Sequence, residues 1–246
     1  MLKKAAVLAM TASALTIAPA AFGALSGYST DFESLNAGDG AALGGDGWKV
    51  FANVFEPGGG FLFGYGPFDA PNMSGGFSNV ATGEGGPDQG NQQLVVFSDY
   101  NNGDAHNAGN LVEANVFQEQ IISGSDIGSE WTFSFDAKRG DIGGNSSSLA
   151  FIKTLDPNAG FALTNFLIID TTNIADTWGT FSLSLFIDGS LDGQILQFGF
   201  ANTATSFEAS GVFYDNVEFR PVPLPGAVWL MLSGLAAFTG MRRRAA

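Results

Sequence analysis

The stretch "WTFSFDAK", residues 131–138, alternates strictly between apolar and polar side chains. Its odd-numbered positions are Trp131, Phe133, Phe135 and Ala137, and its even-numbered positions are Thr132, Ser134, Asp136 and Lys138. A period of two places the apolar set on one face of a β-strand and the polar set on the other. Two later segments, "TFSLSLFI" (180–187) and "QILQFGFA" (194–201), repeat this pattern. The three segments therefore predict half-buried strands.

Further strands are expected on both sides of these segments, separated by turn-forming clusters such as "EPGGG", "RGDIGGNSS" and "DPNAG". The candidates are 48–55, 93–98, 111–118, 149–154 and 165–170. The 246-residue chain contains 34 glycines and 23 phenylalanines, and it has no cysteine for a disulfide or a thiolate metal site. Many short strands with Gly/Asp/Asn turns predict an all-β fold, an antiparallel two-sheet β-sandwich of the jelly-roll kind, over residues 24–220.

The charge is distributed unevenly along the chain. The net charge is −14, yet five of the ten basic residues lie at the two ends: Lys3, Lys4, Arg242, Arg243 and Arg244. The region between them has five basic residues against all 24 acids. Nucleic acid is excluded as a partner, because phosphate binding needs clustered Lys and Arg. Such acidity suits an extracellular protein that binds calcium or a neutral glycan, or it serves solubility alone.

The first 23 residues have the layout of a secretory signal peptide. Two lysines precede an apolar stretch that begins at Ala5, and small residues follow Pro19. We expect a signal helix over 1–23 with cleavage after Gly23, and cleavage after Ala20 is the alternative.

Residues 221–246 form a second targeting segment. Pro223, Leu224 and Pro225 precede an apolar run over 226–241, and Arg242–Arg244 follow it. A helix over the run would be about 24 Å long, which is shorter than the hydrocarbon core of about 30 Å. It can still cross the membrane where the bilayer thins locally, so the run predicts a short transmembrane helix. The arginines favour the cytoplasmic side, which leaves the body outside.

The Pro-x-Pro motif, the short apolar run and the terminal arginines together resemble the PEP-CTERM sorting signal. Leu224 replaces the glutamate of that signal, so the tail resembles the "VPLP" variant. The resemblance implies a Gram-negative bacterium that makes exopolysaccharide. It also implies a precursor held in the inner membrane with its body in the periplasm, an exosortase-type processing enzyme as partner, and a final place at the cell surface or in the extracellular matrix.

The body resembles carbohydrate-binding-module-like jelly rolls in the order of its later segments. These are "DTWGTFSLSLFI" (176–187), "GQILQFGFANTA" (193–204) and "GVFYDNVEF" (211–219), with "DFESL" (31–35) as the opening strand. The resemblance implies a jelly-roll fold and a glycan as a possible ligand.

The segment "GVFYDNVEF" predicts a calcium site. By strict alternation Phe213, Asp215, Val217 and Phe219 share one face, which places Asp215 inside the sandwich. A buried carboxylate needs a partner, and calcium is a common extracellular one. We expect Glu33 of the opening strand and Asp215 of the last strand to bind one structural Ca²⁺. The alternative is that Asp215 accepts hydrogen bonds from backbone amides or a tyrosine.

Four aromatic residues beside glycine-rich turns are candidates for stacking on sugar rings: Trp48, Tyr65, Tyr100 and Trp178. The alternative is that they fill the core. His106, the single histidine, lies in "NNGDAHNAGN" and is expected in an exposed loop.

We therefore expect a non-catalytic structural or adhesive protein with possible exopolysaccharide binding. No G-x-S-x-G motif, P-loop or dinucleotide-binding motif is present. The alternative is a secreted carbohydrate-active enzyme, a glycoside hydrolase or lyase, whose catalytic acids the spacing does not identify.

Overall fold

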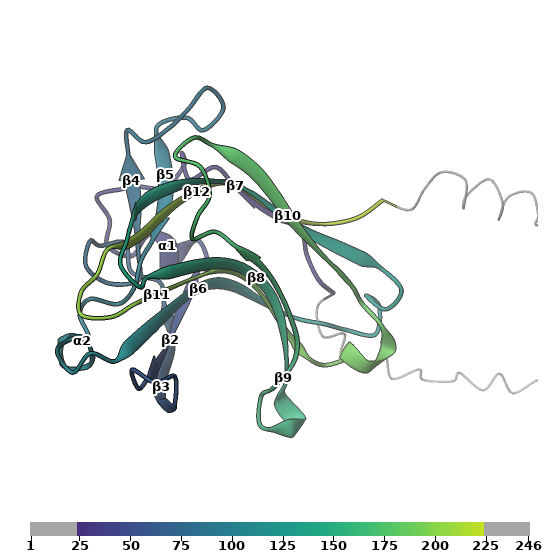
Figure 1. The fold of residues 1–246 in the computed structure, drawn as a ribbon. Coiled ribbons are helices and arrows are strands. Elements are labelled where there is room, and N and C mark those ends of the chain that lie inside the picture. Colours follow the sequence, from purple (N-terminus) through teal and green to yellow (C-terminus); the bar gives the residue numbers. More distant parts are fainter. Residues whose placement is uncertain (1–23, 224–246) are drawn as a thin grey trace, which may run out of the picture.

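The computed structural model describes residues 24–223, which form two six-stranded antiparallel sheets packed face to face (Figure 1). The prediction of an antiparallel β-sandwich is confirmed. The predicted signal helix over 1–23 and the transmembrane helix over 226–241 lie outside the described residues. Within residues 24–223, no helix is long and apolar enough to span a membrane.

Sheet A has the strand order β10-β7-β12-β5-β4, and β1 pairs with β12. Its strands are β1 (Tyr28–Thr30), β4 (Ser78–Thr82), β5 (Gln92–Val96), β7 (Glu130–Ile142), β10 (Gly179–Phe186) and β12 (Ser210–Pro221).

Sheet B has the order β3-β2-β6-β11-β8-β9. Its strands are β2 (Lys49–Phe55), β3 (Phe61–Asp69), β6 (Leu111–Ile121), β8 (Ser147–Asp156), β9 (Ala162–Asp170) and β11 (Ile195–Ala204). In Figure 1 the strands β6, β11 and β8 bend together, and the hollow of the bend is turned away from sheet A. The short helices are α1 (Ala42–Gly45), α2 (Gly103–Asn107), η1 (Pro157–Ala159) and η2 (Gly189–Leu191).

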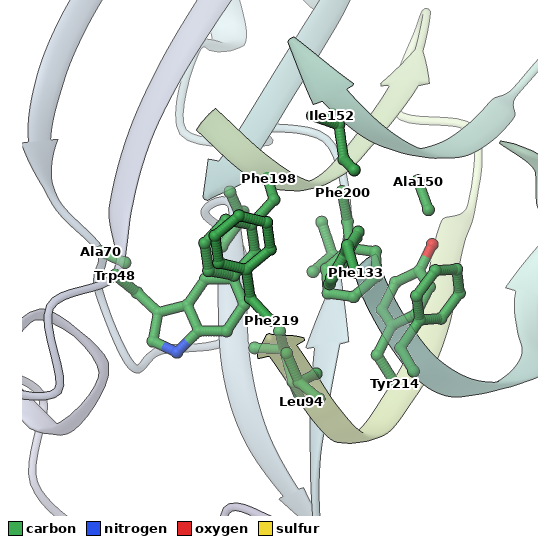
Figure 2. Close-up of a cluster of buried hydrophobic side chains, with 14 of the residues drawn as sticks. Trp48, Ala70, Leu94, Phe133, Ala150, Ile152, Phe198, Phe200, Tyr214 and Phe219 are labelled. Atoms are coloured by element: carbon green, nitrogen blue, oxygen red, sulfur yellow. The ribbon is translucent and has the colours of Figure 1, made fainter. Parts of the chain in front are cut away.

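The core between the sheets is built from aromatic rings (Figure 2). The alternation of β7 and β11 is confirmed, because Phe133 and Phe135 of β7 meet Phe198 and Phe200 of β11, and all four are buried. Tyr214 stacks on Phe200 with ring centroids 3.6 Å apart. Burying each such ring contributes roughly 1.5–3 kcal/mol.

A β-bulge in β12 changes which residues face the core. Asp215 pairs with Asp136, but Glu218 pairs with Ser134, so β12 contains one extra residue there, and Asn216 has a positive φ of 46°. The prediction that one face runs unbroken from Phe213 to Phe219 is wrong. Before the bulge Val212 and Tyr214 are buried in the core, and after it Val217 and Phe219 are. Phe213 faces outward beside Lys138, whose Nζ lies 5.3 Å from the ring centroid.

Candidate functional site

The four aromatic residues expected to bind sugar differ in their burial and in their hydrogen-bond partners. Trp48 is a correction: it is 0% exposed, lies in the core, and donates from Nε1 to the Tyr28 hydroxyl at 2.8 Å, so its ring face is closed to a ligand (Figure 2). Tyr65 and Tyr100 are half-buried, and their hydroxyls donate to Asp99 Oδ2 and the Glu208 carbonyl at 2.7 Å. Trp178 is half-buried against the loop before β5 and donates to the Glu84 carbonyl.

His106 is buried rather than exposed, with 1% of its surface accessible, because it lies on α2 with its side chain under the loop before β12. Its ring stacks on Phe207 at 4.8 Å, and its Nδ1 accepts the backbone N–H of Phe207 at 3.3 Å. Burial lowers the pKa of His106, against an opposing effect of Asp99. A neutral imidazole is therefore part of the packing of this loop.

Asp215 lies on the outer side of sheet A, beside Asp136, and is nevertheless 0% exposed. Its Oδ1 accepts the backbone N–H of Asn216 at 2.6 Å, while its Oδ2 is buried and has no hydrogen-bond donor. Burial, together with the nearby carboxylates of Asp31, Asp136 and Glu33, raises the pKa of Asp215 to about 7, against the opposing effect of the Asn216 hydrogen bond. A cation at Oδ2 would relieve both effects.

The rest of this acidic cluster is well bonded. Glu33 Oε1 accepts the backbone N–H groups of Asn91 and Gln92 at 2.5 and 2.6 Å. Asp136 accepts from Thr180, Gln89 and Asn216 at 2.6 to 2.9 Å, and its pKa is lowered by these hydrogen bonds in spite of burial. Residues 31–35 form a turn after β1 rather than the expected opening strand, and from this turn Glu33 lies close enough to Asp215 to raise its pKa. In the described part of the chain, however, no three acidic or histidine side chains are grouped closely enough to hold a metal by themselves.

The outer side of sheet A also has a hollow of about 720 Å³ beside Asp136. Hydroxyl side chains dominate its lining: Ser29, Thr30, Thr132, Ser134, Thr180 and Ser182. Phe135 is its single aromatic lining residue, and the ring of Phe135 belongs to the core.

The hollow side of sheet B has a different composition, with aromatic and polar side chains together. We name this surface the B face and define it by the outward residues Phe51, Asn53, Glu113, Asn115, Phe117, Glu119, Phe151, Lys153, Phe166 and Gln197. The register places Phe51 beside Asn115 on one side of the face, and Lys153 beside Phe166 on the other. Phe117 and Phe151 flank Gly199 at its centre and are only 1% and 0% exposed, although they point away from the core.

The polar groups of the B face form two connected sets. Glu113 Oε1 accepts from the side-chain amides of Asn53 and Asn115 at 2.8 and 2.9 Å, and Asn115 Oδ1 accepts from Lys153 Nζ at 3.3 Å. Gln197 donates to Glu119 Oε2 at 2.5 Å. Burial lowers the pKa of Lys153 to about 8, even though Glu113 and Glu119 oppose this shift.

Sequence reasoning missed the B face because its central rings break the alternation that marks an exposed face. In β6 the residues from Ala114 to Gln118 are all buried, so the outward positions look like core positions. The available signal was Gly199, where an added Cβ would meet the Val116 carbonyl oxygen and the Phe117 backbone. A glycine in a central strand marks such a close approach.

Comparison with known proteins shows no family. No protein-family model and no curated protein matches the chain. Among solved structures, the CBM22-2 xylan-binding domain from Paenibacillus barcinonensis Xyn10C is 14% identical with a TM-score of 0.45, over 79% of this chain and 99% of that domain. The enzymatically active domain of tailspike protein 4 from bacteriophage CBA120 is 15% identical with a TM-score of 0.43, over 77% of this chain and 21% of the tailspike chain.

A cyclase from Fischerella sp. TAU is 14% identical with a TM-score of 0.41, over 80% of this chain and 95% of the cyclase. Similarities of this size carry no argument about family or ligand, so the function has to be argued from the B face itself.

Proposed function

We propose that this protein is an exported, non-catalytic β-sandwich that binds a polysaccharide on the B face. The B face of the bent sheet carries aromatic rings at both margins and amide and carboxylate groups between them. This combination is the observation that carries the proposal. Aromatic faces stack on the apolar faces of sugar rings, and a few convergent polar groups set the orientation of a ligand.

The margins supply the exposed rings. Phe166 on β9 is 47% exposed, and Phe51 on β2 is half-buried. The ring of Phe51 packs against Gly64 and Gly66 of β3, where an added Cβ would come within 3.0 Å of it. Because these two residues have no side chain, β3 places no side chain over the ring at these positions. Between the margins, Asn53, Glu119 and Gln197 offer side-chain oxygen and nitrogen atoms to sugar hydroxyls. A neutral chain suits a body with 24 acids better than a polyanion does.

The arrangement of acids supports binding rather than catalysis. Glycoside hydrolases need two accessible carboxyl groups about 5–9.5 Å apart. On the B face Glu113 and Glu119 are six residues apart on one strand, which corresponds to about 20 Å. Asp136 and Asp215 lie opposite each other on β7 and β12, but Asp215 is 0% exposed and every hydrogen bond to Asp136 comes from a side chain of the fold. The proposed function therefore includes no sugar cleavage.

The experiment compares the full chain with Phe51→Ala and Phe166→Ala in depletion assays against a polysaccharide panel that includes the host's own exopolysaccharide. Each substitution removes one stacking ring, worth about 1–2 kcal/mol, so binding should weaken roughly 5- to 30-fold. Phe186→Ala is the matched control, because Phe186 is 58% exposed on sheet A. Equal loss in all three variants, or release of sugar by the full chain, would contradict the proposal.

The two chain ends supply the proposed route to the cell surface. The signal peptide directs export, and Pro223, Leu224, Pro225 and Arg242–Arg244 with the run between them hold the precursor in the inner membrane for an exosortase-like enzyme. The mature protein then belongs to the surface or the matrix, where exopolysaccharide is available as a ligand.

Calcium is the proposed structural cofactor. Asp215 Oδ2 is the one carboxylate oxygen among the described buried side chains that has no donor, and Glu33 lies close enough to affect its pKa. Glu33 and Asp215 would hold the ion, with backbone carbonyl oxygens completing a shell of hard oxygen ligands. The ion would neutralise the cluster and fix the opening segment to β12.

A further inference from the structure

Three side chains on the B face bring an amine, an amide and a carboxylate together. Lys153 Nζ lies 3.3 Å from Asn115 Oδ1, so the carbonyl carbon of Asn115 is at most about 4.5 Å from the amine. The amide nitrogen of the same asparagine donates to Glu113 Oε1 at 2.9 Å. Asn53 donates to the same oxygen at 2.8 Å and holds the carboxylate in position.

The surroundings of Lys153 are those of a reactive amine rather than of an ordinary surface lysine. Its Nζ lies 4.6 Å from the ring centroid of Phe151 and 5.5 Å from that of Phe117. Among the described residues Lys153 forms no ion pair within 4 Å. Its side chain reaches from β8 across β11 to β6: Lys153 pairs with Gln197 and Asn115 pairs with Ala201, and Gly199 is the outward residue of β11 between these two positions.

We propose that Lys153 and Asn115 form an intramolecular isopeptide bond, with Glu113 as the catalytic acid–base, which joins β8 covalently to β6. This inference is independent of polysaccharide binding, because it concerns a covalent bond within the chain.

The reaction balances without any co-reactant. The lone pair of the neutral Lys153 amine attacks Asn115 Cγ, and the bond from Cγ to Nδ2 breaks. Glu113 accepts a proton from the attacking nitrogen and returns it to the leaving nitrogen, which departs as ammonia. The products are one secondary amide between Nζ and Cγ, one ammonia molecule and an unchanged carboxylate. No atom is oxidised or reduced.

Each group has a property that its step requires. A lysine pKa of about 8 leaves an appreciable neutral fraction of Lys153 at neutral pH, and burial between two aromatic rings is its cause. Glu113 already contacts the nitrogen that must leave. The fold holds amine and amide together permanently, so the attack is unimolecular.

The test is the intact mass of the full-length chain and of Lys153→Arg, prepared identically so that both have the same ends. After correction for the substitution, the unsubstituted chain should be lighter by the mass of one ammonia molecule. Peptide mapping should find the peptides containing Asn115 and Lys153 joined. Lys138→Arg is the matched control, because Lys138 also lies near two aromatic rings, and that variant should keep the mass loss.

Glu113→Gln keeps the shape of the side chain and removes the proton acceptor, so it should retain the ammonia and yield separate peptides. An unsubstituted chain of full mass with no joined peptide overturns the proposal, whether or not the variants fold. A joined peptide in Glu113→Gln would overturn the role of Glu113. Loss of ammonia located at the Asn102–Gly103 sequence instead, through succinimide formation, would also count against the bond.

Discussion

Asp215 shows how one residue can be buried and still lie outside the core. It follows Tyr214, which faces the core, and therefore lies on the outer side of sheet A, where the loop before β5 covers the cluster around it. Its free Oδ2 makes the site sensitive to cations.

We expect Ca²⁺ to raise the melting temperature and EDTA to lower it. At a free concentration 100-fold above the dissociation constant the ion should add about 2.7 kcal/mol to the free energy of unfolding. Asp215→Asn should abolish the difference between calcium and EDTA, whereas Asp69→Asn, at an exposed ion pair with Lys49, should leave it intact. Melting curves that are identical with calcium and with EDTA would exclude the site.

The buried His106 predicts that the free energy of unfolding depends on pH. Its folded-state pKa is lowered from the ordinary value of 6.5, so its contribution to stability is complete above pH 6.5 and is lost as the pH falls below that value. Protonation also replaces the acceptor at Nδ1 with a donor that faces the Phe207 N–H. Asp215, whose pKa is raised, changes stability in the opposite direction over this range, so the measurement is the difference in the free energy of unfolding between the unsubstituted chain and His106→Gln from pH 8 to pH 5. The advantage of the unsubstituted chain should shrink as the pH falls, and a constant difference would show that His106 does not cause the loss.

At the scale of the strand, Gly199 allows β11 and β6 to approach closely beneath the rings of the B face. Gly199→Ala places a Cβ about 2.7 Å from the Phe117 Cα and against a backbone carbonyl, neither of which can move freely. Overpacking of this kind costs about 1–3 kcal/mol, measurable by urea denaturation. Gly143→Ala is the control, since an added Cβ there meets no atom within 4 Å. Equal stability of both variants would refute the tight approach.

Strand periodicity predicted which segments form strands better than it predicted where a bulge reverses the side to which the residues of a strand point. The alternation in residues 131–137 identified Trp131, Phe133, Phe135 and Ala137 as buried, and the structure confirms all four. The same rule failed in β12 because one extra residue reverses the parity, and nothing in "FYDNVEF" requires a bulge.

The candidate site was harder to predict than the strands, for a reason of geometry. Phe117 and Phe151 are covered because sheet B is bent and Lys153 lies over them, and both conditions depend on contacts between residues far apart in the sequence. Trp48 was misassigned because a tryptophan beside a glycine turn is equally suited to a core and to a surface.

At the scale of the whole molecule, the body and its tail are proposed to act in sequence. We expect the full chain to be found with membranes when exosortase activity is absent. A chain ending at Pro223 should be released into the periplasm or the medium. Fractionation followed by immunoblotting measures this, and replacing Arg242–Arg244 with Asn tests the membrane orientation separately. Equal distribution of the full and shortened chains would contradict a sorting function of the tail.

The pairing of β1 with the last part of β12 brings both ends of the described chain out on the same side of the sandwich (Figure 1). A protein tethered through Pro223 while holding a polymer on sheet B would carry mechanical load along the axis of β12. Because β12 is hydrogen-bonded to β1, β5 and β7, such a pull acts in shear and strains many hydrogen bonds at once instead of opening them one by one. β12 would then act as the force-bearing clamp of the molecule, and resistance to stretching would depend on how firmly its three neighbours hold it.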